Sequence, residues 1–446
     1  MVGPYTTEDN HVLARDQKKI LEVYVNKFSQ GIFGILHEAV LVNGDSLFVY
    51  VDQSGNIQTI DQINDYDRII KPPLRHTSLT KEYSFDTEDE LHQMWNEVRE
   101  FTIDDAFRIS QHIWSQYVST NSYVITLLAA DSIFSYMQDA FGMTHYNFTI
   151  GDNDSGKSAI LNVANEIVYR PFTATSVSDA VLYRVLGNVE EGQAILLLDE
   201  ANRISEVMLD ILKGGYKTGG YVLRVDDLDN KKKVAKYFTY GQKWLAAENS
   251  ISGDGAKGAN ERNFYIHAIR GTPKSYIADI LKPKNKNKFK KELDEISNFR
   301  KTMLLYKLKH FGDNYPDLQL SVNNRDRELT ESILSLFYGS NCINQIVDTL
   351  SIFLTEKRQK KIQTVEAILY DIVTEFRDRL EESLKKIASM LPSDIFDILS
   401  RRMKERKLNQ TLDNDDIFEI PSDVIIELLK RNPIAVGNTI KETENQ

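Results

Sequence analysis

The segment GDNDSGKS, residues 151–158, has the residue types and spacing of a phosphate-binding loop, G-x-x-x-x-G-K-[ST]. Gly151 and Gly156 permit backbone angles that a β-carbon would forbid, so successive N–H groups can surround an anion. Lys157 is expected to reach the β- and γ-phosphates, and the Ser158 hydroxyl to bind Mg²⁺. The alternative is a polar turn that matches by accident. The predicted nucleotide-binding residues are Gly151, Asp152, Asn153, Asp154, Ser155, Gly156, Lys157 and Ser158.

The residues on either side of this segment support the first interpretation. Tyr146, Phe148 and Ile150 alternate with more polar residues, as in a buried strand. Apolar residues at helical spacing follow the segment: Ile160, Leu161, Val163, Ala164 and Ile167. Strand, glycine loop and helix therefore occur in the order that phosphate binding requires, because the positive end of the helix then points at the anion.

A pair of acids follows a second apolar run, Ile195–Leu198. The run predicts a buried parallel strand, and ligands bind at the carboxyl ends of such strands. On a neighbouring strand, Asp199 would hold Mg²⁺ and Glu200 would orient and polarise the attacking water. The alternative is that the two acids only cap the next helix.

Two more polar residues stand beside predicted strands. Asn249 follows the run Trp244-Leu-Ala-Ala and could hydrogen-bond the γ-phosphate or the attacking water, or be a turn asparagine. Arg262 precedes an apolar run that begins at Phe264. Its planar guanidinium suits the charge that develops on a transferring phosphoryl group, although a structural salt bridge is the alternative. The spacing leaves open whether Arg262 would reach its own nucleotide or that of a neighbour.

Between the acid pair and Asn249, two runs of strand character, 221–225 and 234–240, flank the turn residues Asp229 and Asn230. They predict a β-hairpin with Lys231, Lys232 and Lys233 at or beside its tip. The ordinary explanation of such lysines is that they keep an exposed strand edge soluble.

The periodicity of the whole chain predicts four parts. A small β-rich domain with a leading helix over residues 1 to about 30 occupies 1–80, and a helical connector occupies 81–145. An α/β core with a parallel sheet occupies 146–275, and an all-helical region occupies 276–446. Helices are expected at about 87–100, 103–119, 121–141, 178–186, 204–212, 288–311, 326–340, 342–356, 362–389 and 393–406, followed by a short unit at 411–431.

Composition limits the classes of protein further. The chain has 446 residues and one cysteine, Cys342, which excludes internal disulfides and cysteine-based zinc sites. No apolar run is long enough to cross a membrane, and the first residues lack the apolar core of a signal peptide, so a cytoplasmic protein is expected. The net charge of −11 means that any contact with nucleic acid must be local.

Taken in order, GDNDSGKS, ILLLDE, LAAENS and ANERNF resemble the Walker A, Walker B, sensor 1 and arginine-finger motifs of the AAA+ class of P-loop ATPases. The predicted hairpin occurs where superfamily 3 viral helicases and minichromosome-maintenance helicases carry a pre-sensor-1 hairpin. The whole string is also similar to uncharacterised helicase-like ATPases of archaea. The resemblance covers residues 120–275 and implies ATP and Mg²⁺ as cofactors, assembly into a ring, expected to be a hexamer, and an Arg262 that acts on the neighbouring subunit.

In the helicases that the chain resembles, this hairpin enters the central channel of the ring. The resemblance therefore implies that Lys231, Lys232 and Lys233 bind single- or double-stranded DNA, and residues 391–432 are a further candidate for binding DNA or a partner. Two functions remain open. The first is a ring-forming motor that translocates on or unwinds DNA, and the second is an ATP-switched regulator or protein-remodelling ATPase. The lysines favour the first, and the acidic net charge favours the second.

Overall fold

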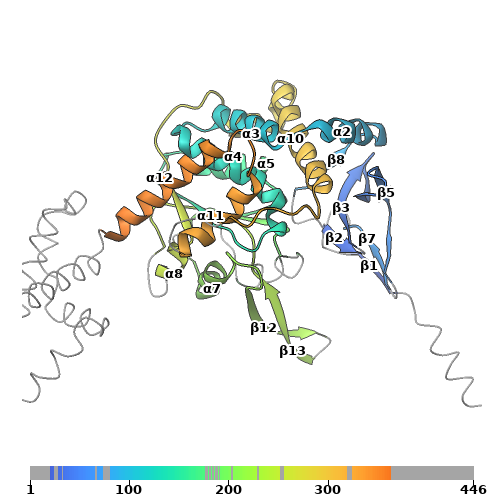
Figure 1. Cartoon of the computed structure of the whole chain (residues 1–446), viewed down its shortest axis with the longest axis horizontal. Helices are drawn as coiled ribbons and strands as arrows, with labels where there is room; N and C mark the ends of the chain where they lie inside the picture. Colours follow the sequence, from blue (N-terminus) through green and yellow to red (C-terminus); the bar gives the residue numbers. More distant parts are fainter. Residues whose placement is uncertain are drawn as a thin grey trace, which may run out of the picture. The chain divides into compact units, whose positions relative to one another are not determined.

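The structure is a computed structural model (Figure 1) and describes most of the first 362 residues. The described residues are 21–24, 29–32, 34–65, 68–73, 81–175, 179, 182, 185, 189, 191–201, 204–228, 231–251, 256–318 and 324–362. Backbone contacts divide the chain into two compact units, Met1–Ser351 and Ile352–Gln446. The helices predicted at 178–186, 362–389 and 393–406, and the units at 391–432 and 411–431, lie largely or wholly outside the described residues.

The centre of the first unit is a five-stranded parallel sheet with the order β10-β11-β14-β9-β15. Its strands are β9 (Tyr146–Ile150), β10 (Pro171–Ala174), β11 (Ile195–Leu198), β14 (Lys243–Ala247) and β15 (Asn263–His267). The predicted parallel α/β core is confirmed. Two details differ: β10 was not predicted, and β11 is not next to β9, because β14 lies between them. Short apolar strands carry no signal for their order, which depends on pairing between distant segments.

Helices cover this sheet. They include α5 (Lys157–Ile167), which packs against β9, β10, β11 and β14, and α3 (Ile103–Tyr117), whose Trp114 ring stacks on Trp244 of β14 with the ring centroids 5.8 Å apart. The neighbouring α4 (Ser122–Met137) is buried from Val124 to Met137, as its almost uninterrupted apolar sequence predicts. A short 3₁₀ helix, η2 (Gln138–Ala140), links α4 to the segment before β9.

The predicted connector helices form between clear sequence signals. At the start of α2 (Glu88–Glu100), the Thr87 hydroxyl accepts a hydrogen bond from the Glu90 N–H at 3.1 Å. Thr102 and Asp105 form a reciprocal capping box at the start of α3. The remaining helices are α7 (Glu206–Gly214), α8 (Ala256–Asn260), α9 (Ile277–Ile280), η3 (Pro283–Asn285), α10 (Lys290–Lys309), α11 (Asn324–Leu336) and α12 (Ile343–Ile362).

The N-terminal part is β-rich, as predicted. One sheet contains β2 (Ser29–Ile32), β3 (Ile35–Val42), β4 (Asp45–Val51), β5 (Ile57–Ile60) and β8 (Ser84–Phe85), and a smaller one contains β1 (Leu21–Tyr24), β6 (Ile63–Asp65) and β7 (Arg68–Lys71). Asn43 and Gly44 connect β3 to β4 with φ values of 52° and 86°, as the Asn-Gly signal predicts. The predicted leading helix is wrong over β1 and β2, where pairing with β7 and β3 makes the chain extended.

The predicted hairpin is present as a separate two-stranded sheet. It consists of β12 (Tyr221–Leu228) and β13 (Lys231–Phe238), with Tyr221 opposite Phe238 and Leu228 opposite Lys231. The predicted turn residues Asp229 and Asn230 lie outside the described residues. In Figure 1 the two strands project away from the central sheet, below α7.

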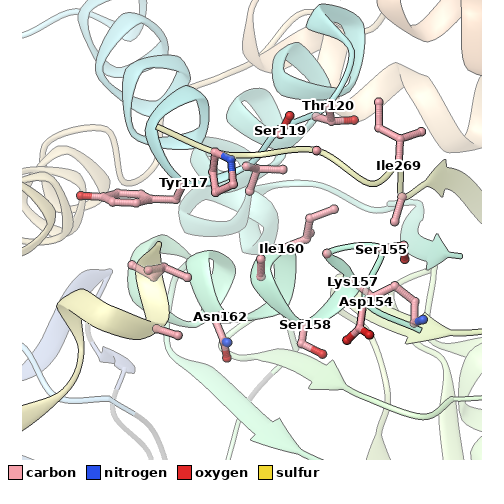
Figure 2. A pocket seen from close by; sticks show the side chains of 18 of the residues that line it. Tyr117, Ser119, Thr120, Asp154, Ser155, Lys157, Ser158, Ile160, Asn162 and Ile269 are labelled. Carbon is pink, nitrogen blue, oxygen red and sulfur yellow. The ribbon is translucent and has the colours of Figure 1, made fainter. Parts of the chain in front are cut away.

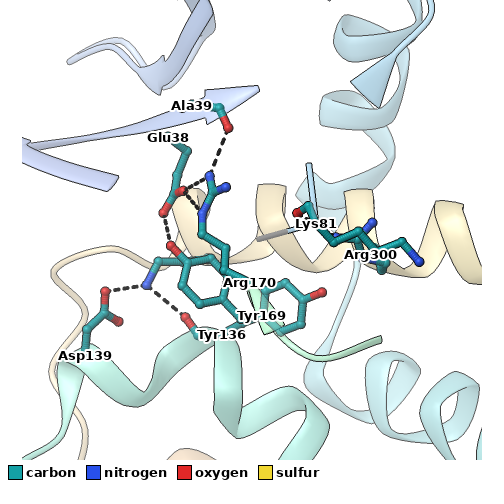
Figure 3. Close-up of polar contacts among 9 residues, drawn as sticks. Glu38, Ala39, Lys81, Tyr136, Asp139, Tyr169, Arg170 and Arg300 are labelled. Atoms are coloured by element: carbon teal, nitrogen blue, oxygen red, sulfur yellow. Dashed lines mark hydrogen bonds and ion pairs between the residues drawn. The ribbon is translucent and has the colours of Figure 1, made fainter. Parts of the chain in front are cut away.

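A buried ion pair joins the N-terminal sheet to the α/β core (Figure 3). Glu38 on β3 and Arg170, just before β10, are 0% and 1% exposed, and Arg170 Nη2 lies 2.7 Å from Glu38 Oε2. The Tyr169 hydroxyl donates to Glu38 Oε1 at 2.7 Å, and Arg170 also donates to the Ala39 carbonyl at 2.9 Å. Burial, the largest single influence, opposes the charge on Arg170, but the Glu38 carboxylate together with Tyr169 and Tyr83 outweighs burial and raises the pKa of Arg170 above its ordinary value.

Replacing Arg170 with methionine should destabilise the protein strongly, because Glu38 would remain buried without its charged partner. We expect the free energy of unfolding in urea to fall by about 3–5 kcal/mol. The double variant Glu38→Gln/Arg170→Met should regain much of this loss, since neither charge is then buried. A loss of less than about 1 kcal/mol in the single variant would contradict a structural role for the pair.

Candidate functional site

A cavity of about 910 Å³ opens at the carboxyl ends of the parallel strands (Figure 2). The predicted phosphate loop forms one side, and Figure 2 shows Asp154, Lys157 and Ser158 there. The other side comes from two segments that were not predicted to contribute: residues 117–120 between α3 and α4, and residues 268–278 after β15. A cavity of this size, closed by separate segments, is typical of a site for a nucleotide-sized ligand.

The phosphate loop has the close contacts that its glycines predict. Gly156 has φ +97° and begins α5, so a β-carbon there would be strained. A β-carbon on Gly151 would lie 2.6 Å from Ser155 Oγ and 3.0 Å from the Ala268 carbonyl oxygen. The Ser155 hydroxyl is buried and forms no hydrogen bond with any described residue. The loop is therefore packed too closely for a side chain at residue 151, and it leaves the Ser155 hydroxyl without a partner among the described residues.

The ammonium group of Lys157 lies over the loop itself. Its Nζ donates to the Gly151 and Asp152 carbonyl oxygens at 2.5 and 2.6 Å. These contacts hold one positive charge at the rim of the loop, next to the amino-terminal end of α5. Both features favour a bound anion, so the loop fits the phosphates of a nucleotide.

The two predicted metal ligands meet directly. The Ser158 hydroxyl, in α5, donates to Asp199 Oδ2 at 3.3 Å. The strands that precede these two residues, β9 and β11, are separated in the sheet by β14. A hydroxyl and a carboxylate are oxygen ligands of the kind that Mg²⁺ prefers, together with water and phosphate. The pair therefore fits Mg²⁺.

Glu200 is held in a left-handed backbone conformation with φ +52°. Hydrogen bonds fix it on both sides: its own N–H donates to Asp199 Oδ1 at 2.9 Å, and the Ala201 N–H donates to the Ala246 carbonyl at 2.8 Å. This conformation costs roughly 1 kcal/mol or more for a residue with a side chain. It leaves the Glu200 side chain exposed at the cavity, where it can contact a water molecule.

The remaining predicted residues lie in different places. At the end of β14 the cavity is lined by Ala247 and Glu248, and Asn249 is exposed just beyond them. Arg270, which was not predicted, donates from Nη2 to the Asn153 carbonyl of the phosphate loop at 3.3 Å. Its sequence signal is modest: an arginine directly after a predicted strand, followed by the loop residues Gly271, Thr272 and Pro273.

Arg262 lies at the opposite edge of the sheet from the phosphate loop. It precedes β15, whereas Gly151 follows β9, and these two strands are parallel neighbours. Five residues of strand separate the two edges by about 16 Å. Arg262 donates to the Gly258 carbonyl oxygen, and its guanidinium lies 4.6 Å from the centre of the Tyr216 ring. It is therefore too far away to contact a nucleotide bound to its own chain.

The base of the hairpin is anchored at this same edge by Lys243, the first residue of β14. Lys243 is 3% exposed, and its Nζ donates to the carbonyl oxygens of Thr239, Gly241 and Gly215 at 2.9, 2.8 and 3.3 Å. Thr239 directly follows β13 and Gly215 directly follows α7, so one side chain contacts the segments on both sides of the hairpin. Burial lowers the pKa of Lys243 to about 7.

Among the described residues, no helix combines the length and the apolar sequence needed to cross a membrane.

Comparisons with known proteins add limited information. No protein-family model matches the chain, and no significant match to a curated protein was found. Among solved structures, a complex of JCV helicase with a small organic compound is 13% identical and covers 60% of this chain and 69% of that chain, with a TM-score of 0.27. The apo C-terminal region of NrS-1 is 9% identical and covers 83% and 87%, with a TM-score of 0.31. These low scores leave the function to be argued from the residues of this chain.

The lowered pKa of Lys243 predicts a specific dependence of stability on pH. The unfolded chain keeps this lysine protonated up to about pH 10.5, whereas the folded chain loses the proton near pH 7. Unfolding therefore takes up a proton between these values, and stability contributed at this position should rise with pH from about 7 to about 10. The measurement is the difference in free energy of unfolding between wild type and Lys243→Met across this range.

As pH rises, the free energy of unfolding of wild type should increase relative to that of Lys243→Met. The other titrating groups are the same in both proteins, so their contributions cancel in the difference. Lys217→Met, which removes an exposed lysine near the hairpin, is the matched control for the loss of a lysine that is not buried. A difference for Lys243→Met that does not change with pH would show that this lysine stays charged when buried.

Proposed function

We propose that this chain hydrolyses ATP and uses the energy to move on DNA as a ring-forming, helicase-like AAA+ motor. The observation that carries the catalytic part is the hydrogen bond between Ser158 and Asp199, which joins the phosphate-loop motif to the acid pair at one cavity. Asp199 and Ser158 would hold Mg²⁺, which supplies charge neutralisation at the phosphates. The AAA+ resemblance of the motif order supports the same class of reaction.

Each part of the cavity would have its own role in ATP hydrolysis. Backbone N–H groups of residues 151–158 and the Lys157 ammonium bind and orient the phosphates. Glu200 accepts a hydrogen bond from the attacking water and orients it, from a backbone that is already fixed in place. Residues 117–120 and 268–278 would enclose the nucleoside and exclude water from the phosphates.

ATP hydrolysis should depend on Lys157 and Glu200 in different ways. Lys157→Ala removes a charge that faces the phosphates, so ATP affinity should fall about ten- to a hundredfold. Glu200→Gln keeps the shape and loses the base, so ATP should still bind while turnover falls about a hundredfold or more. Nucleotide binding by fluorescence titration and phosphate release measure the two effects. Wild-type turnover in Glu200→Gln would contradict the role of this glutamate.

We also propose that Arg262 acts on the nucleotide of a neighbouring subunit. Its position at the far edge of the sheet rules out contact with its own nucleotide, and an arginine supplied in trans accelerates hydrolysis about 10³- to 10⁵-fold in related reactions. Mixed Arg262→Ala and Lys157→Ala subunits should therefore recover some activity, since some interfaces would pair an intact arginine with an intact phosphate loop.

The control for this mixture is the assembly state of each variant alone. Arg262 also stacks on Tyr216, so its replacement by alanine removes a packing contact, and Arg262→Lys, which keeps the charge, is tested beside it. If all variants assemble as wild type does and no mixture is active, Arg262 is a structural residue.

DNA is proposed to contact the hairpin through Lys231, Lys232 and Lys233, which are the first three residues of β13. Replacing all three with alanine should abolish stimulation of the ATPase by single-stranded DNA and leave basal hydrolysis nearly unchanged. Loss of three phosphate contacts should also lower the slope of log affinity against log salt by about 2. Unchanged DNA affinity at low salt would favour the protein-remodelling alternative, which the net charge of −11 also favours.

A further inference from the structure

One face of the hairpin is apolar and open to solvent. The register places Tyr221 opposite Phe238 and Leu223 opposite Lys236, and Val234 stands two residues before Lys236, so these side chains share a face. We call Tyr221, Leu223, Val234, Lys236 and Phe238 the aromatic face. Its large apolar members are 50%, 60%, 68% and 39% exposed for Tyr221, Leu223, Val234 and Phe238. Such a cluster of exposed apolar side chains marks a binding surface.

A lysine lies across the two aromatic rings of this face. Lys236 Nζ is 4.0 Å from the centre of the Tyr221 ring and 4.8 Å from the centre of the Phe238 ring. A cation therefore already interacts with both rings, and both rings are partly exposed to solvent. The exposed lysine needs only to rotate about its side-chain bonds to free the rings.

The charge of the hairpin differs in sign from that of the chain. Residues 221–238 contain five basic and three acidic side chains, which gives +2, whereas the whole chain carries −11. A stacking surface for single-stranded nucleic acid combines exposed aromatic rings with cations along one groove or ribbon. The core of a protein–protein interface, in contrast, is depleted in lysine, and Lys236 lies in the middle of this face.

We infer that the aromatic face binds single-stranded nucleic acid by stacking unpaired bases on Tyr221 and Phe238, with Lys236 moving from the rings to a phosphate. This inference rests on the proposed nucleic-acid motor and specifies how its hairpin holds the strand. The two rings lie at the base of the hairpin, and Lys231 is seven residues along β13 from Phe238, or about 23 Å away. Base stacking and phosphate contact at the tip are therefore separate and can be tested separately.

The experiment compares two fluorescein-labelled oligonucleotides of the same length: one of deoxythymidine and one that is abasic, with phosphates and sugars only. The test variant is Tyr221→Leu/Phe238→Leu, which keeps apolar bulk and removes both rings. Wild type should bind the thymidine strand more tightly than the abasic strand. The variant should lose about five- to a hundredfold in affinity for thymidine per stacked base, and nothing for the abasic strand.

Two control variants separate stacking from other causes. Tyr221→Phe/Phe238→Tyr keeps both rings and should bind as wild type does, which also excludes a folding defect at these positions. Leu223→Ala/Val234→Ala removes apolar area from the same face without touching a ring, and should leave thymidine affinity nearly unchanged. Thermal unfolding of each variant confirms that the hairpin substitutions leave the core intact.

Each outcome decides the matter. If the ring-less variant binds thymidine as wild type does, or if removing Leu223 and Val234 costs as much as removing the rings, base stacking is wrong. A change in oligomeric state with the latter variant would assign the face to a second copy of the chain. The proposed function has a separate contradicting result, in which wild type binds neither oligonucleotide at low salt. If affinity falls only in the variant that lacks Lys231, Lys232 and Lys233, the hairpin contacts DNA without stacking bases.

Discussion

The parallel alignment of five strands is the constraint on which the rest of this molecule depends. Because all the strands run the same way, every loop that follows a strand lies at one edge of the sheet. The phosphate loop, the acid pair Asp199 and Glu200, and the segment after β15 are therefore gathered at a single cavity. The segments that precede strands, including Arg262 and the base of the hairpin, lie about 16 Å away at the other edge.

β14 connects these two edges. At its carboxyl end, the Ala247 carbonyl accepts a hydrogen bond from the Gly151 N–H at 3.3 Å, and the Ala246 carbonyl accepts one from Ala201. At its amino end, Lys243 donates hydrogen bonds to the carbonyl oxygens of Gly215 and Thr239, on either side of the hairpin. One buried strand of five residues thus contacts the phosphate loop, the acid pair and the hairpin base.

Strained backbone and a buried unpaired hydroxyl occur at the cavity, as they also do elsewhere among the described residues. Asp154 and Glu200 adopt left-handed backbone conformations with φ values of 62° and 52°, and the Ser155 hydroxyl is buried without a partner among the described residues. Hydrogen bonds from the Glu200 N–H to Asp199 Oδ1 and from the Ala201 N–H to β14 hold Glu200 in its conformation. Groups fixed in this way need little reorganisation when a ligand binds, which is how polar residues stabilise developing charge. The N-terminal sheet is fixed to the same core by the buried Glu38–Arg170 pair.

Local sequence was sufficient for the features that short segments specify alone. The glycine pattern at 151–158, the run before Asp199 and the Asp229-Asn230 turn each depend on neighbouring residues, and the structure has the predicted strand, helix and hairpin there. Tertiary structure decided what depends on pairing between distant segments. It placed β14 between β9 and β11, made residues 21–24 a strand, and brought 117–120 to the cavity. Residues of similar apolarity fit several pairings, and only the packing of the whole chain selects one.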